Sequence, residues 1–552
     1  MPSLDAAQER HVVIDRRPGQ YLCFPDVCLA ADGGLVCIYN EFDRHVGTRR
    51  KLLVKISRDQ GHTWGEALSP MDEQSHCPRV ARLDDGGLLL LDDAAQSVLR
   101  SADNGVSWER HQDRALVHGL LDRPLDLGDR TLLTAGHRHV GEVLPKIRQK
   151  PSEQAAYLSR NSGRSWERLS VIAHMECLVL CEASVIRLPQ AQGERGGPPR
   201  LLALMRENSF VGEPMYYCLS PDGGATWSAP APTPLVGHRP CLGWTRSGRL
   251  LVTYRDVGPD PGTKAWLGGL DELCSDFAVH GLHPAPASVT PTPEGLLVRS
   301  AAGPKQAVRY LLRPLTDAQR AHAEFEAEVL VRAADEQGCG IRLGVWWRLF
   351  PDCIVPDAPW AGAIAWEPGR PHTVRIVYEP GLCRLFVDGA ACGEYPVDPL
   401  DGNTRPILFG AVSRRDSNGC EALWRRVSLS IREPAPLAVR AVAPGAGPAS
   451  APGNKPGPAQ HFQPGPERVY SWRWHHSQGL PDAETDSRVL ELKNDRDASP
   501  GDFGYSGWVE LADGEFFCVH HHGGGYEPEY LEGYSAHILG TRIFEQDFGA
   551  KA

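Results

Sequence analysis

Pairs of short apolar segments joined by turns recur along most of the chain. Each pair has a strand-length apolar run, a turn that usually contains Gly next to Asp or Ser, and a second apolar run. Examples are CFPDVCLAADGGLVCIYNE from Cys23 and HRPCLGWTRSGRLLVTYRD from His238. This pattern is typical of β-hairpins. Five such pairs, with a weaker sixth in GLLDRPLDLGDRTLLTAGHR from Gly119, predict an all-β chain with six hairpin units.

A second repeat, S-x-D-x-G-x-[ST]-W, occurs four times between these hairpins. Its copies are Ser57–Trp64, Ser101–Trp108, Ser159–Trp166 and Ser220–Trp227. In the third copy Asn161 replaces the Asp. An Asp side chain bonds backbone N–H groups ahead of it, Gly supplies a left-handed turn position, and Trp anchors the returning strand. The motif therefore predicts a stapled turn with a structural role.

These residues resemble the Asp-box of the sialidase superfamily. The resemblance implies a six-bladed β-propeller whose boxes lie on the outer side of the blades, away from the active site. The last hairpin ends at SAHILGTRIF from Ser535 and leaves its blade with three strands. The segment HVVIDRR, His11–Arg17, is predicted to supply the fourth strand. Such pairing closes the ring and removes the open strand edges.

The repeat rhythm stops in the second half of the chain, where a different strand-rich pattern begins. Its run HTVRIVYEPGLCRLFVDG from His372 resembles laminin-G and concanavalin-like jelly rolls, which implies an inserted β-sandwich. A Pro/Ala/Gly-rich stretch follows and is typical of a linker. The expected organisation is propeller blades 1–5 over 1–276, the sandwich over 277–432, the linker over 433–466, and the end of blade 5 with blade 6 over 467–552.

Two roles are open for the insert at this stage. It either binds carbohydrate or serves as a packing module that shapes the rim of the propeller. Exposed Trp346, Trp347 and Trp360 would stack on sugar faces, whereas aromatic residues in strand-rich runs commonly fill a core.

Composition excludes several classes of partner. The 552 residues carry 58 Lys and Arg against 69 Asp and Glu, a net charge of -11, so no nucleic acid or anionic membrane partner is expected. The N-terminus has charges where a signal peptide needs an apolar region, and no run of about 18 apolar residues follows. We therefore expect a cytoplasmic protein. Its 15 Cys residues are scattered through apolar strands and predict buried, reduced thiols.

The residues that start the inner strands of a propeller converge on its axis. Here these are Pro25-Asp26, Pro78-Arg79, Asp122-Arg123, Glu182, His238-Arg239 and Gly504-Tyr505. Guanidinium groups bind a carboxylate through two parallel hydrogen bonds, so converging arginines suit a negatively charged sugar. The predicted substrate-binding residues are Arg79, Arg239, Arg255, Arg206, Arg44, Asp26 and His520.

The resemblance to sialidases implies roles for individual residues. Tyr505 in GYSGWVEL is placed as the nucleophile and Glu182 in CEASVIRL as its activating base. A phenol has a pKa of about 10 and needs such a base. The chain departs from the family at Cys23, which occupies the place of the first substrate-binding arginine. No residue cleanly matches the acid/base aspartate, and Glu41 and Asp43 are the candidates, unless their loop is simply a solvated charged rim.

The favoured function is a sialidase-like glycoside hydrolase that acts on a terminal acidic or polar sugar. Two alternatives remain at this stage: a non-catalytic propeller that binds glycans, and a lyase that cleaves uronate-containing polysaccharides. A glycan is the expected partner in each case, and the oligomeric state is left open. No cofactor is expected. His520-His521-His522 alternates between two faces of its strand and is interpreted as a histidine-rich blade edge, so no metal site is predicted.

Overall fold

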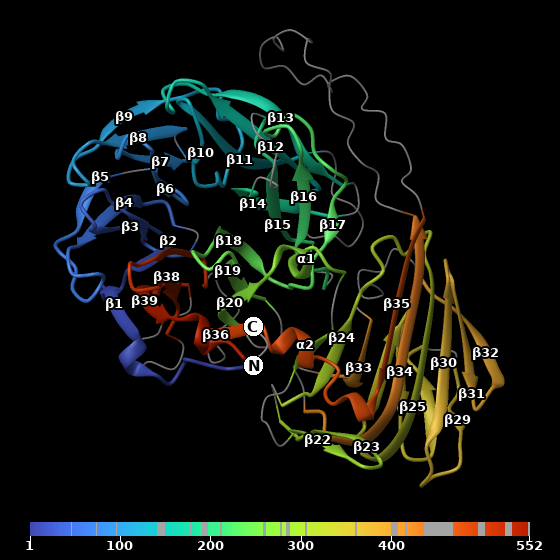
Figure 1. Cartoon of the computed structure of the whole chain (residues 1–552). Helices are drawn as coiled ribbons and strands as arrows, with labels where there is room; N and C mark the ends of the chain where they lie inside the picture. The colour runs from blue at the N-terminus through green and yellow to red at the C-terminus, as the bar shows by residue number, and fades with distance from the viewer. Residues whose placement is uncertain are drawn as a thin grey trace.

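A computed structural model describes residues 1–549 except 46, 73, 95, 141–149, 176–177, 190–196, 210–211, 258–260, 277–278, 283–287, 304–305, 359–360, 399–406, 414–416, 435–466, 495–502, 525–530 and 532. It contains a ring of four-stranded sheets and, beside it, a pair of larger sheets (Figure 1). None of the helices in these residues is long and apolar enough to cross a membrane. The short helices are η1 (Gln8–Arg10), α1 (Leu270–Leu273), η4 (His476–Gln478), α2 (Ala483–Asp486) and η5 (Glu545–Asp547).

The ring is a six-bladed β-propeller, as the sequence predicts. Blade 1 consists of β2 (Tyr21–Leu29), β3 (Leu35–Phe42), β4 (Arg50–Ser57) and β5 (Leu68–Met71). Blade 2 consists of β6 (Arg79–Arg82), β7 (Leu88–Asp92), β8 (Ser97–Ser101) and β9 (Glu109–Gln112). Blade 3 consists of β10 (Leu125–Gly128), β11 (Thr131–His139), β12 (Ser152–Ser159) and β13 (Glu167–His174).

The remaining blades follow the same antiparallel order. Blade 4 consists of β14 (Leu180–Arg187), β15 (Leu201–Glu207), β16 (Tyr216–Ser220) and β17 (Ala231–Pro232). Blade 5 consists of β18 (His238–Trp244), β19 (Leu250–Asp256), β20 (Gly262–Gly268) and β36 (Val489–Asn494). Blade 6 consists of β37 (Ser506–Glu510), β38 (Phe516–His522), β39 (His537–Ile543) and β1 (His11–Asp15). In Figure 1, β2, β6, β14 and β18 lie nearest the centre of the ring.

The N-terminal strand closes the ring. β1 pairs antiparallel with β39, with His11 opposite Thr541 and Val13 opposite Leu539. Ile14 is buried in a hydrophobic cluster that also takes side chains from blades 1 and 6. This confirms the closure predicted from the three-stranded final hairpin.

The Asp-boxes staple the turn between the third and fourth strands of blades 1 to 4. In blade 1 the Oγ of Ser57 accepts the N–H of Gly61 at 2.8 Å, and Oδ1 of Asp59 accepts the N–H of Thr63 at 2.9 Å. The other three boxes repeat both bonds, with Asn161 in the acceptor role in blade 3. The boxes therefore use their polar groups internally, in keeping with a structural role.

The box glycines also set the spacing between blades. A Cβ on Gly61 would lie 2.7 Å from the ring of Phe517 in blade 6. The box glycines of blades 2, 3 and 4 press in the same way on Val36, Leu89 and Leu133, each in the preceding blade. Only a glycine permits both this approach and the positive φ of the turn.

We expect Gly61→Ala to lower the free energy of unfolding by about 2–4 kcal/mol, because it adds overpacking against a buried ring to backbone strain. Gly248→Ala is the matched control. Its φ of 86° is close to the 87° of Gly61, yet nothing lies within 4 Å of the added Cβ. The control should cost only the backbone strain, about 1 kcal/mol. Urea denaturation measures both, and equal losses would contradict the interblade contact.

The second unit lies between β20 and β36, so it interrupts blade 5. Its first sheet has the order β21 (His280–Leu282), β24 (Arg309–Leu312), β33 (Ile407–Ala411), β26 (Cys339–Leu343), β27 (Val345–Leu349), β28 (Cys353–Pro356) and β29 (Ile364–Ala365). Its second sheet has the order β22 (Val289–Thr292), β23 (Gly295–Ser300), β34 (Cys420–Pro434), β25 (His322–Ala334), β30 (His372–Glu379), β31 (Leu382–Val387) and β32 (Ala390–Pro396), with β35 (Glu467–His475) paired to β34. One hydrophobic core, which includes Phe325, Trp347 and Phe409, takes side chains from both sheets.

Two expectations about this unit need correction. β35 pairs with β34 and buries Tyr470 and Trp474 in the core of the insert, so the propeller returns at β36 and not near residue 467. Trp347 is fully buried and is not available to stack on a sugar, because alternation along β27 turns it inward, whereas Trp346 is partly exposed. Trp360 lies outside the described residues. The likeness to laminin-G and concanavalin-like domains stays a prediction.

Buried polar contacts join the two units. Tyr216 of blade 4 donates a hydrogen bond to Glu213 at 2.8 Å, and its hydroxyl lies 3.4 Å from that of Thr316 in the insert. Burial and then the charges of Glu207 and Glu433 raise the pKa of Glu213 to about 8. Glu213 is therefore mostly protonated at neutral pH, which avoids an unpaired charge at the joint.

Candidate functional site

Each blade places one residue with left-handed backbone at the start of its inner strand. These six residues, here called the axial ring, are Phe24 (φ 53°), Cys77 (47°), Leu120 (50°), Glu182 (49°), Arg239 (49°) and Gly504 (72°). In blades 1, 4 and 5 the pairing of the inner strand with its neighbour shifts register at the left-handed residue. A left-handed non-glycine residue costs roughly 1–3 kcal/mol, and such strain clusters at functional sites. Its recurrence in five blades makes the axis the candidate site.

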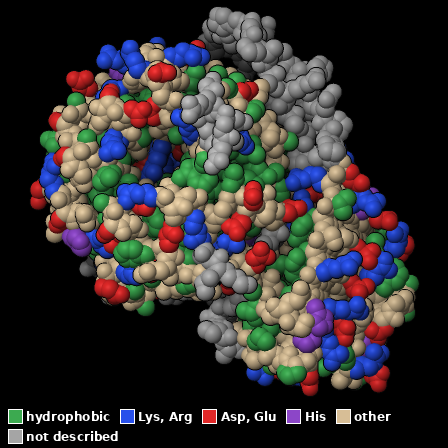
Figure 2. Space-filling model, viewed as in Figure 1, with side chains coloured by type: hydrophobic (Ala, Val, Ile, Leu, Met, Phe, Trp, Pro, Cys, Tyr) green, Lys and Arg blue, Asp and Glu red, His purple; other side chains and the backbone are tan. Residues whose placement is uncertain are grey.

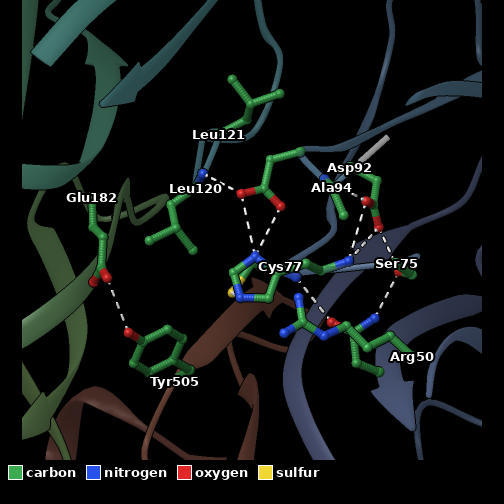
Figure 3. A network of polar contacts seen from close by, with 12 residues as sticks. Arg50, Ser75, Cys77, Asp92, Ala94, Leu120, Leu121, Glu182 and Tyr505 are labelled. Carbon is green, nitrogen blue, oxygen red and sulfur yellow. Dashed lines mark hydrogen bonds and ion pairs between the residues drawn. The ribbon is translucent and has the colours of Figure 1, made fainter. Parts of the chain in front are cut away.

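A hydrogen-bonded triad forms around one member of this ring, Glu182. The phenol of Tyr505 donates to Oε1 of Glu182 at 3.0 Å (Figure 3). Arg206 places Nη1 2.6 Å from the same oxygen and 2.9 Å from the Tyr505 hydroxyl. The three side chains are 3–7% exposed. The structure therefore brings together the two residues that the sequence singled out as nucleophile and base, and adds Arg206, which was predicted only as a substrate contact.

Electrostatics keep the Glu182 carboxyl ionised. Burial favours its neutral form, but Arg206 and then Arg239 outweigh burial and hold the pKa of Glu182 well below its usual range. Arg239 also lies over the Tyr505 ring, with its guanidinium carbon 5.9 Å from the centroid. An ionised carboxylate is the form that accepts a phenolic hydrogen bond. Figure 2 shows Lys or Arg side chains within a recess on this face of the propeller.

Three buried polar atoms of this group have no hydrogen-bond partner among the described residues. They are Oε2 of Glu182, Nε of Arg206 and Nε of Arg239. Buried polar groups are almost always paired in native proteins. A carboxylate oxygen and two N–H donors left over at one place are what a polar ligand would satisfy.

Blade 1 contributes an aromatic side chain to the ring. Phe24 lies 5.0 Å from the Tyr505 ring, measured between centroids, and also contacts Phe42, His76 and His521. Cys23, predicted to stand where sialidases have an arginine, is fully buried in the same apolar cluster. This side of the site therefore offers an apolar surface in place of a third guanidinium.

Asp26 and Arg79 belong to a separate buried ion cluster. Both oxygens of Asp26 accept from Nε of Arg123 at 3.0 Å, and Arg79 lies 3.5 Å away. Burial favours the neutral acid, but Arg123 and Arg79 outweigh it and lower the pKa of Asp26. Arg79 also donates to the backbone oxygen of Ser506 in blade 6 at 3.0 Å. The cluster ties four blades together, which fits a structural role better than substrate contact.

The two candidates for the acid/base role make their own polar contacts. Glu41 pairs with Arg17 at 2.5 Å and Lys51 at 3.8 Å. Asp43 accepts the backbone N–H of Arg49 at 3.3 Å.

The two remaining arginines lie in blades 1 and 5. Arg44 is exposed. Arg255, on β19, stacks on Phe503 with its guanidinium carbon 4.8 Å from the ring centroid.

A second polar group, which was not predicted from the sequence, adjoins the axial ring at Cys77. His76 places Nδ1 3.0 Å and 3.2 Å from the two oxygens of Asp93, and its Nε2 lies 3.9 Å from Sγ of Cys77. Figure 3 shows the neighbouring residues Cys77 and Asp92 in the same view as Tyr505 and Glu182. The available signal was His76 immediately before the inner strand of blade 2, combined with the Asp92-Asp93 pair that ends the next strand.

His520 lies in a buried histidine cluster of blade 6. Its Nε2 is 2.9 Å from the hydroxyl of Thr541, which also lies 3.0 Å from Nδ1 of His11. His522 and His537 contact edge to face at 5.4 Å. Within the described part of the chain no group of three or more His, Cys, Asp or Glu side chains is arranged to hold a metal ion.

This cluster predicts loss of stability in mild acid. Burial, followed by the charges of His522 and Arg16, lowers the pKa of His537 to about 3. A group whose pKa falls on folding stabilises the protein above its unfolded pKa of about 6.5 and loses that contribution as pH falls. At pH 5 the cost is about 2 kcal/mol for one such histidine. His537→Gln should flatten the dependence of unfolding free energy on pH between 7 and 5, whereas an unchanged slope would contradict the assignment.

Comparison with known proteins gives one family match. Residues 91–257 match the family model of the BNR repeat-like domain. No curated protein matches the chain. Similar solved structures include a protein of unknown function from Dyadobacter fermentans DSM 18053, with 18% identity, a TM-score of 0.41, and coverage of 55% of this chain and 94% of that one.

Two enzymes are among the other similar structures. Trypanosoma rangeli sialidase in complex with sialic acid has 12% identity, a TM-score of 0.32, and coverage of 73% of this chain and 81% of that one. Sucrose-6-phosphate hydrolase from Lactobacillus gasseri has 11% identity, a TM-score of 0.31, and coverage of 76% and 94%. We draw no conclusion from similarities this low. The six blades, the four repeated turns and the family match over residues 91–257 together identify the ring as a six-bladed β-propeller with BNR-type repeats.

Proposed function

We propose that the protein is a glycoside hydrolase that uses Tyr505 as its nucleophile and acts on a terminal polar sugar. The observation that carries this proposal is the hydrogen bond between the Tyr505 phenol and Glu182, 3.0 Å long, with Arg206 contacting both groups. Tyrosine becomes a competent nucleophile when a neighbouring base takes its proton, and sialidases are the glycosidases known for a tyrosine nucleophile.

The surrounding charges support this chemistry. Arg206 and Arg239 are within reach of developing negative charge on the Tyr505 oxygen, one by hydrogen bond and one over the ring face. Both would stabilise a phenolate and so lower the barrier to attack on the anomeric carbon. The unpartnered oxygen of Glu182 and the unpartnered Nε of each arginine supply one acceptor and two donors for a polar ligand.

The two arginines also influence whether the site prefers an acidic or a neutral sugar. Both terminal nitrogens of Arg239 donate to backbone oxygens of Leu120 and Leu121, at 3.2 Å and 3.1 Å. Arg206 is engaged with Glu182, Tyr505 and Asn208. Because their forks are already occupied, an acidic sugar would be held by Nε contacts and overall positive charge, and the apolar Phe24 favours a substrate with an apolar face.

A panel of aryl glycosides tests the proposal. Sialic acid, its deaminated analogue, a uronate and neutral sugars are compared by release of the phenol. The proposal expects turnover of at least one glycoside that Tyr505→Phe abolishes. Binding of glycans with no turnover of any glycoside would instead favour the second candidate, a glycan-binding propeller, whose supporting observation is Phe24 packed against Tyr505.

A further inference from the structure

A glycosidase that works through a covalent intermediate needs a second group that gives a proton to the leaving oxygen and later takes one from water. The two residues predicted for this role are held elsewhere. Glu41 is ion-paired with Arg17 and Lys51, and Asp43 accepts the backbone N–H of Arg49. The proton donor is therefore sought among the residues that adjoin the axial ring.

His76 has the geometry of such a group. Its Nδ1 is fixed by the Asp93 carboxylate at 3.0 Å and 3.2 Å, and its backbone N–H donates to Asp92 at 3.1 Å. The ring stacks on Phe42 with an interplanar angle of 17°. The His76 side chain is 27% exposed while that of Asp93 is 9% exposed. The imidazole is thus oriented by a buried partner and remains reachable by a ligand.

Two separate connections place His76 beside the triad. Phe24 contacts the Tyr505 ring at 5.0 Å and the His76 ring at 5.4 Å, so both rings flank the same side chain. Asp93 also accepts the N–H of Leu120 at 2.7 Å, and the oxygen of Leu120 accepts from Arg239, which lies over Tyr505. The first connection is a contact between aromatic rings, and the second is a chain of hydrogen bonds.

We propose that His76 is the general acid and base of this site, that Asp93 is its positioning residue, and that the two act opposite the Tyr505–Glu182 pair. The proposal rests on the proposed function. His76 would here do the work predicted for Glu41 or Asp43. Asp93 does not touch the substrate but fixes which ring nitrogen carries the transferable proton.

The reaction has two steps. In the first, the Tyr505 oxygen forms a bond to the anomeric carbon and its proton passes to Glu182. The bond from that carbon to the leaving oxygen breaks, its electron pair stays on the oxygen, and the oxygen takes the Nε2 proton of His76. In the second, water attacks the anomeric carbon and gives its proton to His76. The Tyr505 oxygen then leaves with the bonding pair and recovers its proton from Glu182.

The groups that face His76 support the acid role. Burial disfavours a charged imidazole, but the Cys77 sulfur and the Asp93 carboxylate outweigh burial, so the pKa of His76 is raised. Asp92 faces its backbone N–H. An imidazole protonated at neutral pH is ready to donate, and activity should fall as pH rises through its pKa.

The test compares leaving groups. A dinitrophenolate leaves without a proton, whereas an alkoxide needs one. We expect His76→Gln to lower kcat/KM for an alkyl glycoside by about 10²–10³-fold and for the dinitrophenyl glycoside by less than about tenfold. His62→Gln is the control, because His62 is exposed in the blade 1 Asp-box and should leave both values unchanged. Equal losses on both substrates, or no loss on either, would overturn the role of His76.

Asp93→Asn tests positioning. It should move the alkaline limb of the pH profile to lower pH by about one unit or more, because the carboxylate that favours the charged ring is lost. The imidazole titration of His76, followed by NMR without substrate, should shift in the same direction, and an unmoved titration would contradict the pairing. An inactive Tyr505→Phe beside a fully active His76→Gln refutes this inference alone. A fully active Tyr505→Phe, or a parent that cleaves neither glycoside, refutes the proposed function and this inference with it.

Discussion

Tyr505→Phe should lower kcat by at least about three orders of magnitude on any glycoside that the parent cleaves, while the substrate still binds. The substitution removes only the phenolic oxygen. It keeps the ring contacts with Phe24 and Arg239, so the apolar shape of the site is retained. KM should therefore change far less than kcat. Stopped assays of phenol release, with binding followed by calorimetry, measure the two separately.

Tyr217→Phe is the matched control for this change. Tyr217 lies on β16 of blade 4, and its hydroxyl bonds the backbone oxygen of Cys274 at 3.3 Å, away from the axial ring. Its loss should cost about 1 kcal/mol of stability and no turnover. Undiminished activity in Tyr505→Phe would exclude a tyrosine nucleophile.

Asp26→Asn should lower the free energy of unfolding by about 3 kcal/mol or more. The change leaves Arg79 and Arg123 close together without the carboxylate that offsets their charges, and removal of one partner from a buried ion pair costs about 3–5 kcal/mol. Asp26 is fully buried, as is nearly all of Arg79. The shift should appear in the unfolding transition of the propeller, measured by urea denaturation.

The surface pair of Asp32 and Arg58 provides the comparison. Their side chains are 30% and 60% exposed, and the amide oxygen of an Asn can still accept the N–H of Gly34. Asp32→Asn should cost less than about 1 kcal/mol. If the two variants unfold at the same urea concentration, the cluster around Asp26 does not hold the blades together.

The propeller was predictable because its signals are local and periodic. Each hairpin and each Asp-box is specified within a few residues, and their count gives the number of blades. Ring closure by His11–Asp15 followed from one missing strand. β35 was misplaced because it pairs with β34 across residues 435–466, and no local pattern reports such a distant partner.

The site was predictable in part, because the propeller fold fixes where the inner strands begin. Inner-strand starts converge in any propeller, so Tyr505 and Glu182 were placed at the axis from their positions, and the resemblance to sialidases supplied their roles. The left-handed residues that turn these side chains toward one another depend on bulged register, which sequence periodicity does not reveal. His76 lies just before β6 and Asp93 lies just after β7, so their pairing depends on how these two strands are placed in space. The sequence around each residue carries no motif that predicts the pair.

The central claim is that the Tyr505 oxygen forms a bond to the sugar. Incubation with a mechanism-based fluoroglycosyl fluoride of whichever sugar the parent cleaves, followed by peptide mass spectrometry, tests this most directly. The account predicts one added glycosyl group on the peptide that contains Tyr505, and none in Tyr505→Phe. Turnover without this adduct, or an adduct on a carboxylate or on Cys77 with Tyr505 unmodified, would contradict it.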